Sequence, residues 1–192
     1  MSEIESILEE LSSEDEQRCE QAIIRLVNMG ESALTALKPQ LTHPQADKRW
    51  WAVRALAGFP DREATRLLIE AMDDAEPSVR HCAALALAGR SDEDAIAALA
   101  AALSSPDRLF ARLAANALVS TGTAAVPALL NQIEQNAEAP RVEIYRSLAL
   151  IGDPRAIPAL FNATEDDSAL TEYWAQEGLE RMGVGMVYFK PE

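Results

Sequence analysis

The stretch KRWWAVRALAG, residues 48–58, recurs in outline 31 residues further along the chain as VRHCAALALAG, residues 79–89. Aligning the two stretches superimposes one leucine, and the same register continues in both directions. The aligned leucines are spaced by 30 or 31 residues: Leu26, Leu56, Leu87, Leu118, Leu148 and Leu179. Four positions before each leucine stands a small or aliphatic residue: Ala22, Ala52, Ala83, Ala114, Ile144 and Ala175. A period of this length along the whole chain indicates a repeat architecture.

A second apolar segment lies between consecutive stretches of this kind, as in AIAALAAAL (95–103) and AIPALFNAT (156–164). Its apolar residues recur at helical spacing, and IESILEEL (4–11) opens the chain in the same way. The period therefore predicts twelve helices in six pairs. A pair of this size cannot bury its apolar face alone, so neighbouring pairs must stack. The predicted fold is all-α, an α-solenoid with a right-handed superhelix.

The pattern V-R-x-x-A-A-x-A-L followed by A-[VI]-P-A-L resembles HEAT repeats, in the short form named after phycobilisome lyases. VRHCAALALAGRSDEDAIAAL (79–99) and RVEIYRSLALIGDPRAIPAL (141–160) carry the pattern best. The resemblance covers nearly the whole chain and predicts a single repeat domain over residues 1–183. An apolar tail, residues 184–192, is expected to cover the last repeat. The predicted repeats are approximately 3–30, 31–58, 61–89, 91–122, 124–152 and 154–183.

Composition narrows the functional classes. The 192 residues carry a net charge of −14, which disfavours a protein that coats nucleic acid or an anionic membrane. Cys19 and Cys82 lie far apart and form no metal or redox spacing, so we expect reduced thiols and a cytoplasmic protein. The acidic N-terminus lacks the features of a signal peptide. No apolar segment is expected to cross a membrane.

The face of the second helix in each pair follows from the leucine register. At roughly 100° per residue, positions −8, −4, −3, −1, 0 and +3 from the leucine share one side, which we predict to be core. Positions −6, −5, −2 and +2 lie opposite, and the HEAT resemblance implies that they line a concave surface. All three tryptophans fall there, together with arginines, and both residue types are enriched at binding hot spots. The predicted binding residues are Trp50, Trp51, Arg54, His81, Leu85, Arg112, Asn116, Arg146, Tyr173 and Trp174.

Structural roles compete with binding at some of these positions. A ring at position −5, such as Trp51 or Trp174, can also be half-buried in the seam between neighbouring repeats. Arginines at position −7 (Arg49, Arg80 and Arg141) are expected to bridge the turn before their helix. The neighbouring pair His81 and Cys82 points in different directions on a helix and is not expected to form a nucleophile–base dyad.

Related repeat proteins suggest three functions. The leading one is a non-enzymatic scaffold that binds an acidic or amphipathic protein or peptide segment, with no cofactor, catalytic residue or metal. Bilin lyases suggest binding of an open-chain tetrapyrrole, whose two propionates would suit arginines beside stacked rings. HEAT-like alkylpurine DNA glycosylases suggest DNA binding, with Glu143 or Glu177 as candidate acids. The di-iron site of deoxyhypusine hydroxylases is excluded because neither His43 nor His81 is followed by a glutamate. The oligomeric state stays open.

Overall fold

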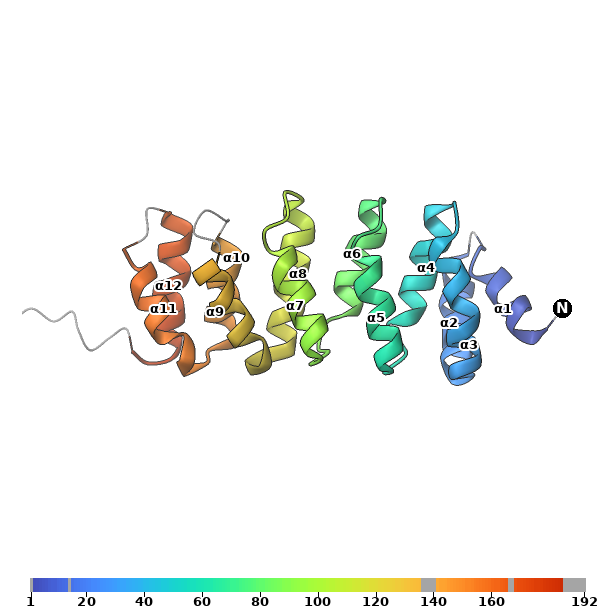
Figure 1. Ribbon diagram of the computed structural model, residues 1–192, viewed down its shortest axis with the longest axis horizontal. Coiled ribbons are helices and arrows are strands. Elements are labelled where there is room, and N and C mark those ends of the chain that lie inside the picture. The colour runs from blue at the N-terminus through green and yellow to red at the C-terminus, as the bar shows by residue number, and fades with distance from the viewer. Residues whose placement is uncertain (1, 14, 136–140, 166–167, 185–192) are drawn as a thin grey trace, which may run out of the picture. The chain divides into compact units, whose positions relative to one another are not determined.

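A computed structural model describes residues 2–13, 15–135, 141–165 and 168–184. These residues form helices and turns, with no β-strand among them (Figure 1). The predicted all-α class, built of six helix pairs, is confirmed. The α-helices are α1 (Glu3–Glu10), α2 (Glu16–Asn28), α3 (Glu31–Leu37), α4 (Ala46–Leu56), α5 (Arg62–Ala71), α6 (Pro77–Ala86), α7 (Glu93–Ala102), α8 (Arg108–Thr121), α9 (Val126–Gln135), α10 (Val142–Ile151), α11 (Ile157–Ala163) and α12 (Ala169–Arg181).

The chain folds as two compact units, Met1–Leu87 and Ala88–Glu192. Helices α1 to α6 belong to the first unit, and α7 to α12 belong to the second. Each predicted repeat contains one helix pair. The single domain over residues 1–183 and the right-handed superhelix stay predictions. The predicted apolar tail, apart from Val184, lies outside the described residues.

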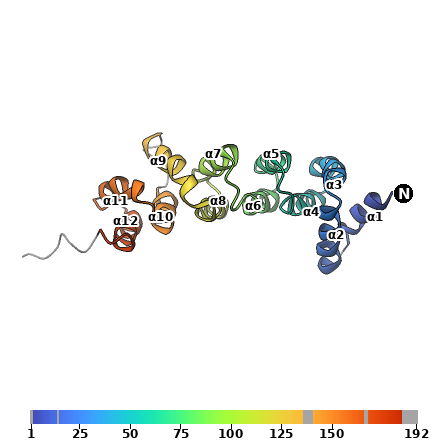
Figure 2. The ribbon, with the colours of Figure 1, turned by 90° about the horizontal axis from the view of Figure 1, so that it is seen from below.

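The leucine register places the core of each unit. All six aligned leucines are buried, with at most 4% of their surface exposed, and the residues four positions earlier are buried as well. Within each unit the even-numbered helices form one layer and the odd-numbered helices other than α1 form the other (Figure 2). Helix α1 lies at the N-terminal end, against α2. Neighbouring even-numbered helices pack on one another: α2 on α4 and α4 on α6 in the first unit, α8 on α10 and α10 on α12 in the second. The short side chains at position −4 let these helices approach closely.

Gly178 shows how close that approach is in the second unit. A Cβ atom added to this residue of α12 would lie 3.0 Å from the Cα of Ala149 on α10 and 3.0 Å from Leu160 Cδ1 on α11. Such a contact is tighter than packed atoms normally allow. Glycine at this position therefore lets α12 lie against both neighbouring helices.

An arginine–aspartate pair ties the second helix pair to the third. The Arg49 guanidinium donates from Nε and Nη2 to the two carboxylate oxygens of Asp74, at 2.7 Å each. Its Nη1 donates to the carbonyl oxygens of His43 and Pro44, in the turn before α4. Arg80 donates in the same way to the carbonyl of Asp74. The predicted bridging role of the arginines at position −7 is confirmed for these two.

Among the described residues, one apolar run is long enough, by composition, to span a membrane: Arg108–Gln135. It is not one uninterrupted α-helix, because α8 ends at Thr121 and a 3-10 turn (Gly122–Ala125) precedes α9. Gly122 has a φ of 74°, a conformation that interrupts a right-handed helix and favours glycine. The sequence analysis overlooked this run. In the structure its helices belong to consecutive pairs of the second unit.

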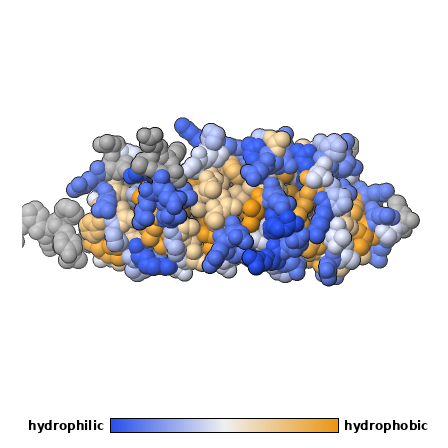
Figure 3. Space-filling view, in the orientation of Figure 1, coloured by the Kyte–Doolittle hydropathy of each residue, from blue (hydrophilic) through white to orange (hydrophobic). Residues whose placement is uncertain are grey.

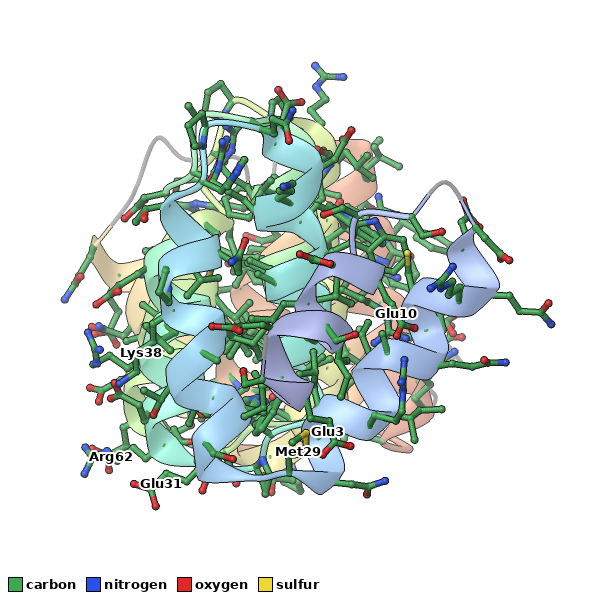
Figure 4. All side chains as sticks on the ribbon, turned by 90° about the vertical axis from the view of Figure 1, so that its right-hand side faces the viewer. Glu3, Glu10, Met29, Glu31, Lys38 and Arg62 are labelled. Atoms are coloured by element: carbon green, nitrogen blue, oxygen red, sulfur yellow. The ribbon has the colours of Figure 1, made fainter. Side chains whose placement is uncertain are left out.

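The exposed sides of the odd-numbered helices differ in polarity from one helix to another. Figure 3 shows hydrophilic side chains over α5 and paler, more apolar ones over the alanine-rich α7. On α5, Arg66 pairs with Glu63 and Glu70, while Lys38 reaches Glu63 at 2.9 Å. At the N-terminal end, Glu10 of α1 lies beside α2 (Figure 4), where its carboxylate pairs with Arg25 and Arg18. These exposed pairs contribute little stability individually.

Candidate binding face of the even-numbered helices

Exposed apolar side chains gather on the even-numbered helices. Of the six large apolar residues that are exposed in the described part of the chain, five lie on α2, α6, α8 or α12, and only Phe161 lies on an odd-numbered helix, α11. Isolated exposed apolar residues are ordinary, but a concentration on one layer is typical of an interaction surface. In each unit, we call the solvent side of its even-numbered helices the even-helix face. The five residues are Ile24, Leu85, Leu109, Leu170 and Tyr173.

In the first unit, Trp50 and Trp51 form an aromatic pair on α4. Their ring centroids lie 4.8 Å apart and the rings are nearly perpendicular, at 89°, which is the favoured edge-to-face arrangement. Both side chains are half-buried. Neither belongs to the buried core, and neither stands free in solvent. The buried part of each ring holds the tryptophan pair in position, while the exposed part presents apolar surface to solvent.

A pocket of about 540 Å³ opens beside Trp50, between α4 and α6. Arg54 lies at its polar edge, where the guanidinium Nη2 donates to Glu20 Oε2 of α2 at 3.0 Å. The positive charge of Arg54 is therefore partly compensated by its own unit. Leu85, which is 54% exposed, provides an apolar wall. The complete lining is Trp50, Arg54, Ala57, Ser78, His81, Cys82, Leu85 and Ala86.

Cys82 lies at the base of this pocket and is only 6% exposed. Burial raises the pKa of its thiol to about 11, an effect that Arg54 opposes and Glu20 adds to. The thiolate is the nucleophilic form of cysteine, so burial disfavours the reactive form of this thiol at neutral pH. Among the described residues no three His, Cys, Asp or Glu side chains lie close enough together to hold a metal ion. The pocket therefore contains a buried thiol that contributes to packing.

In the second unit, Arg146 of α10 connects three helices. Its Nη1 donates to Asn116 Oδ1 of α8 at 2.9 Å, and its guanidinium lies 5.8 Å from the centre of the Trp174 ring on α12. That distance is within range of a cation–π interaction. Burial lowers the pKa of Arg146, and the nearby charge of Arg112 lowers it further, while Glu143 raises it. Arg146 stays charged at all ordinary pH values because the starting pKa is so high.

Tyr173 and Trp174 extend this arrangement along α12. Their ring centroids are 5.2 Å apart at 74°, so the second unit has an edge-to-face pair like that of the first. Arg112 of α8 donates from Nε to Glu143 Oε1 of α10 at 2.6 Å. Glu143 also lies 3.7 Å from Arg146. Each of the three arginines among the predicted binding residues thus has a partner on a neighbouring even-numbered helix.

A second pocket, of about 600 Å³, lies at the N-terminal ends of α8, α10 and α12. Its exposed apolar residues, Leu109 and Leu170, were missed by the sequence analysis. Both stand nine positions before an aligned leucine, which at about 100° per residue is directly opposite the core. The helical-wheel argument considered only positions −6, −5, −2 and +2. The pocket is lined by Leu103, Ser105, Arg108, Leu109, Ala111, Arg112, Val142, Glu143 and Leu170.

The predicted binding residues thus fall into two groups. The first unit brings together Trp50, Trp51 and Arg54 of α4 with His81 and Leu85 of α6. The second unit connects Arg112, Asn116, Arg146, Tyr173 and Trp174 by the contacts given above. None of these ten residues is fully buried. Their role in binding stays a prediction.

The two tryptophans of α4 give a direct test of this placement. Trp50→Ala is expected to lower the free energy of unfolding by roughly 1 kcal/mol, because a half-buried ring loses only part of its contacts. A fully buried aromatic residue would cost about 3–5 kcal/mol. Urea unfolding followed by circular dichroism measures the difference. A loss in the higher range would show that Trp50 serves the core and not a surface.

The buried thiol gives a second test. Cys82 and Cys19, both buried, are expected to react with a thiol reagent such as Ellman's reagent at least about a hundredfold more slowly in the folded protein than in urea. The matched control is Leu85→Cys, which introduces a thiol at an exposed position of the same helix. That thiol should react within the mixing time of an ordinary assay. Equal rates for Cys82 and the introduced thiol would contradict the described burial.

Comparison with known proteins shows where this arrangement belongs. The sequence profile of the family described as HEAT repeats matches residues 34–119 and 98–180, which together make up more than half of the chain. The chain belongs to the HEAT-repeat family. The leucine register and the even-helix face are therefore features of the HEAT repeats of this chain.

Similar proteins include one with an established activity. The phycocyanobilin lyase subunit beta of Nostoc sp. (strain PCC 7120) is 44% identical over 59 residues, which is 31% of this HEAT-repeat chain and 30% of that subunit. The match thus spans less than a third of the lyase subunit's length. It supports the resemblance to the short, lyase-type form of the repeat.

Solved structures support the fold. An engineered protein aligns over 95% of this chain and 99% of its own, with 22% identity and a TM-score of 0.51. The complex of CpcE and CpcF of phycocyanin lyase from Nostoc sp. PCC 7120 aligns over 78% of this chain and 64% of that one, with 21% identity and a TM-score of 0.53. At these identities the likeness concerns the helical-repeat fold alone.

Proposed function

We propose that this HEAT-repeat protein is a non-enzymatic cytoplasmic scaffold that binds a protein or peptide segment on the even-helix face of its units. The observation that carries the proposal is the concentration of exposed apolar side chains, five of six, on the even-numbered helices. Two edge-to-face aromatic pairs adjoin them. Aromatic side chains are enriched at protein-binding surfaces, and patches of exposed apolar side chains mark interaction sites.

The charges on this face favour an amphipathic partner segment over a purely acidic one. Arg54 already pairs with Glu20, Arg112 with Glu143, and Arg146 with Asn116 and the Trp174 ring. A purely acidic peptide would meet arginines whose charge is already partly compensated, so part of the electrostatic gain would be lost. Leucine or aromatic side chains of an amphipathic helix would instead cover apolar surface that is exposed in the free protein.

A scaffold role also agrees with the state of the reactive groups. Cys82 carries a thiol whose pKa is raised to about 11. The two candidate acids of the glycosylase alternative are both paired: Glu143 with Arg112, and Glu177 with Arg181 at 2.7 Å. With a net charge of −14, binding to duplex DNA is expected to be absent even at low salt, where it would be strongest. A salt-sensitive gel shift would favour the glycosylase alternative.

The alternative function is the handling of an open-chain tetrapyrrole, and one observation favours it: the match to a phycocyanobilin lyase subunit. Arg54 beside Trp50 provides a cation and a ring of the kind that such a ligand needs. The compensation of Arg54 by Glu20 weighs against strong propionate binding. Titration with phycocyanobilin tests this alternative. A saturable change in the visible spectrum that Trp50→Ala abolishes would establish it in place of the scaffold.

The scaffold proposal is tested by site-specific photo-crosslinking in the native host. Benzoylphenylalanine replaces Leu85 on α6, Tyr173 on α12 or, as the matched control, Phe161 on α11, which is similarly exposed. The two positions on even-numbered helices are expected to give discrete adducts with defined host proteins, and position 161 is expected to give none of them. The same adducts from all three positions, or no adduct from positions 85 and 173, would contradict the proposal.

A further inference from the structure

We infer that the pocket at the N-terminal ends of α8, α10 and α12, in the second unit, binds the apolar side of an acidic amphipathic helix of the partner. We call it the leucine pocket, defined by the residues that line it: Leu103, Ser105, Arg108, Leu109, Ala111, Arg112, Val142, Glu143 and Leu170. The inference rests on the proposed scaffold function and names the kind of segment that this site takes.

The walls of the leucine pocket are apolar and open to solvent. Leu109 at the start of α8 is 55% exposed and Leu170 at the start of α12 is 61% exposed, and Val142 at the start of α10 also lines the pocket. The volume of about 600 Å³ accommodates several large side chains. Helical partners offer such side chains in rows at positions i, i+3, i+4 and i+7. The pocket therefore fits the apolar stripe of a helix.

Among the residues that line the pocket, positive charge exceeds negative charge, with Arg108 and Arg112 against Glu143, opposite to the chain as a whole. Arg108 is exposed and makes no ion pair with any described residue. Arg112 uses only Nε, toward Glu143, so its two terminal nitrogens make no hydrogen bond to the described part of the chain. The one carboxylate in the lining, Glu143, is shared between Arg112 and Arg146. Asp107, next to Arg108, accepts the Phe110 N–H as the cap of α8.

The charges at the leucine pocket indicate which kind of peptide binds there. The chain carries a net charge of −14, so at long range it attracts basic peptides and repels acidic ones. At the leucine pocket, however, Arg108 and Arg112 offer donors to a carboxylate that lies one turn from an apolar anchor. The pocket of the first unit differs, because its arginine is compensated by Glu20. An acidic amphipathic helix is thus expected at the second unit and not at the first.

Two fluorescein-labelled helical peptides test the inference. Both carry the same leucine stripe, and the remaining positions are glutamate in one peptide and lysine in the other. Fluorescence anisotropy with the full chain at low salt is expected to show at least about tenfold tighter binding of the glutamate peptide. Non-specific attraction to a chain of charge −14 would produce the opposite order. Equal binding, tighter binding of the lysine peptide, or no binding of the glutamate peptide would overturn the inference.

Single substitutions test whether the glutamate peptide binds at the leucine pocket. Arg108→Ala is expected to lower the affinity for the glutamate peptide about fivefold. Leu109→Ala or Leu170→Ala is expected to lower it about tenfold. The matched controls are Arg181→Ala, an exposed arginine near the other end of α12, and Phe161→Ala, an exposed apolar residue on α11. Both controls should stay within about twofold. Because all five side chains are exposed, unfolding midpoints are expected to stay unchanged. If the controls weaken binding as much as the pocket variants, the site is not the leucine pocket.

Failure of this inference is distinguishable from failure of the scaffold proposal. Specific crosslinks from positions 85 or 173, combined with no preference for the glutamate peptide, would leave the scaffold function intact and remove only the leucine pocket. Absence of specific crosslinks from positions 85 and 173, combined with no preference for the glutamate peptide, would remove both.

Discussion

Leu56→Ala is expected to lower the free energy of unfolding of the first unit by about 2–5 kcal/mol. Leu56 ends α4, has no exposed surface and is one of the six aligned leucines. Its truncation would leave a cavity among Ala52, Val53 and the neighbouring helices, all of which are held by their own packing. Close-packed helices relax only partly into such a space, so the loss includes a cavity contribution as well as the transfer of the side chain to water.

The measurement uses the positions of the three tryptophans. A Trp174→Phe background leaves Trp50 and Trp51 as the only tryptophans, so their fluorescence during urea unfolding reports on the first unit. Leu85→Ala is the matched control, because it removes the same atoms from an exposed site. It is expected to change the free energy by less than about 0.5 kcal/mol. Similar losses for the two leucines would show that the leucine register does not define the core.

Arg49→Met is expected to cost about 2–4 kcal/mol of the stability of the same unit. Arg49 and Asp74 are mostly buried, with side-chain exposures of 15% and 11%. Removing the arginine leaves a largely buried carboxylate that, among the described residues, keeps only the Glu76 N–H as a hydrogen-bond donor. Replacing Asp74 as well, by leucine, should recover part of the loss because no unpaired charge then remains. Urea midpoints of the single and double variants measure this coupling.

This pair also predicts a dependence on acid. The hydrogen bond from Arg49 is the main cause that holds the pKa of Asp74 below its usual value, with help from the Glu76 N–H and the charge of Arg80, while burial opposes it. A lowered pKa in the folded state stabilises the protein above the unfolded pKa of about 4, and that contribution disappears as pH falls through the folded value. The native chain should therefore lose stability more steeply below about pH 4 than Arg49→Met does.

Exposed ion pairs provide the contrast with the mostly buried pair of Arg49 and Asp74. Arg66 on α5 pairs with Glu63 and Glu70, all in solvent. Arg66→Met is expected to leave the unfolding midpoint nearly unchanged at neutral pH, because water screens such pairs and their side chains lose freedom when paired. A loss from Arg66→Met as large as that from Arg49→Met would show that burial does not distinguish the two pairs.

The core could be predicted from the sequence because its signal is periodic. Each aligned leucine, together with the residue four positions earlier, repeats with a spacing that only stacked helix pairs explain, and the structure buries every one of them. The same register placed Trp50 and Arg112 on the opposite side of their helices. Periodicity reports the direction of a side chain from its own helix axis, so these assignments needed no knowledge of neighbouring helices.

The periodicity of the sequence could not predict which side chains of neighbouring helices contact each other. Arg54 meets Glu20 across 34 residues and Arg112 meets Glu143 across 31, and each meeting depends on the rotation and shift of one helix against the next. The sequence analysis treated the arginines as a ladder available to a partner, whereas the structure pairs them within each unit. The compensation of their charge therefore became visible only with the coordinates.

The leucine pocket was missed for a simpler reason. Position −9 lies opposite the core, as positions −2 and −6 do. It falls near the start of each helix, and the helical-wheel argument did not include it. Leu109 and Leu170 share this position in the fourth and sixth repeats, and that coincidence is a signal present in the sequence. Extending the wheel to the first turn would have found both residues.

The spacing of the buried leucines has an evolutionary consequence. Since a repeat contacts mainly its immediate neighbours, duplication or deletion of one segment of 30 or 31 residues would preserve the register of every remaining leucine. A shorter insertion or deletion inside a helix would instead rotate the leucine away from the core. Chain length in such a lineage is thus expected to change in whole repeats, and each added repeat would bring another set of surface positions on which selection can act independently of the fold.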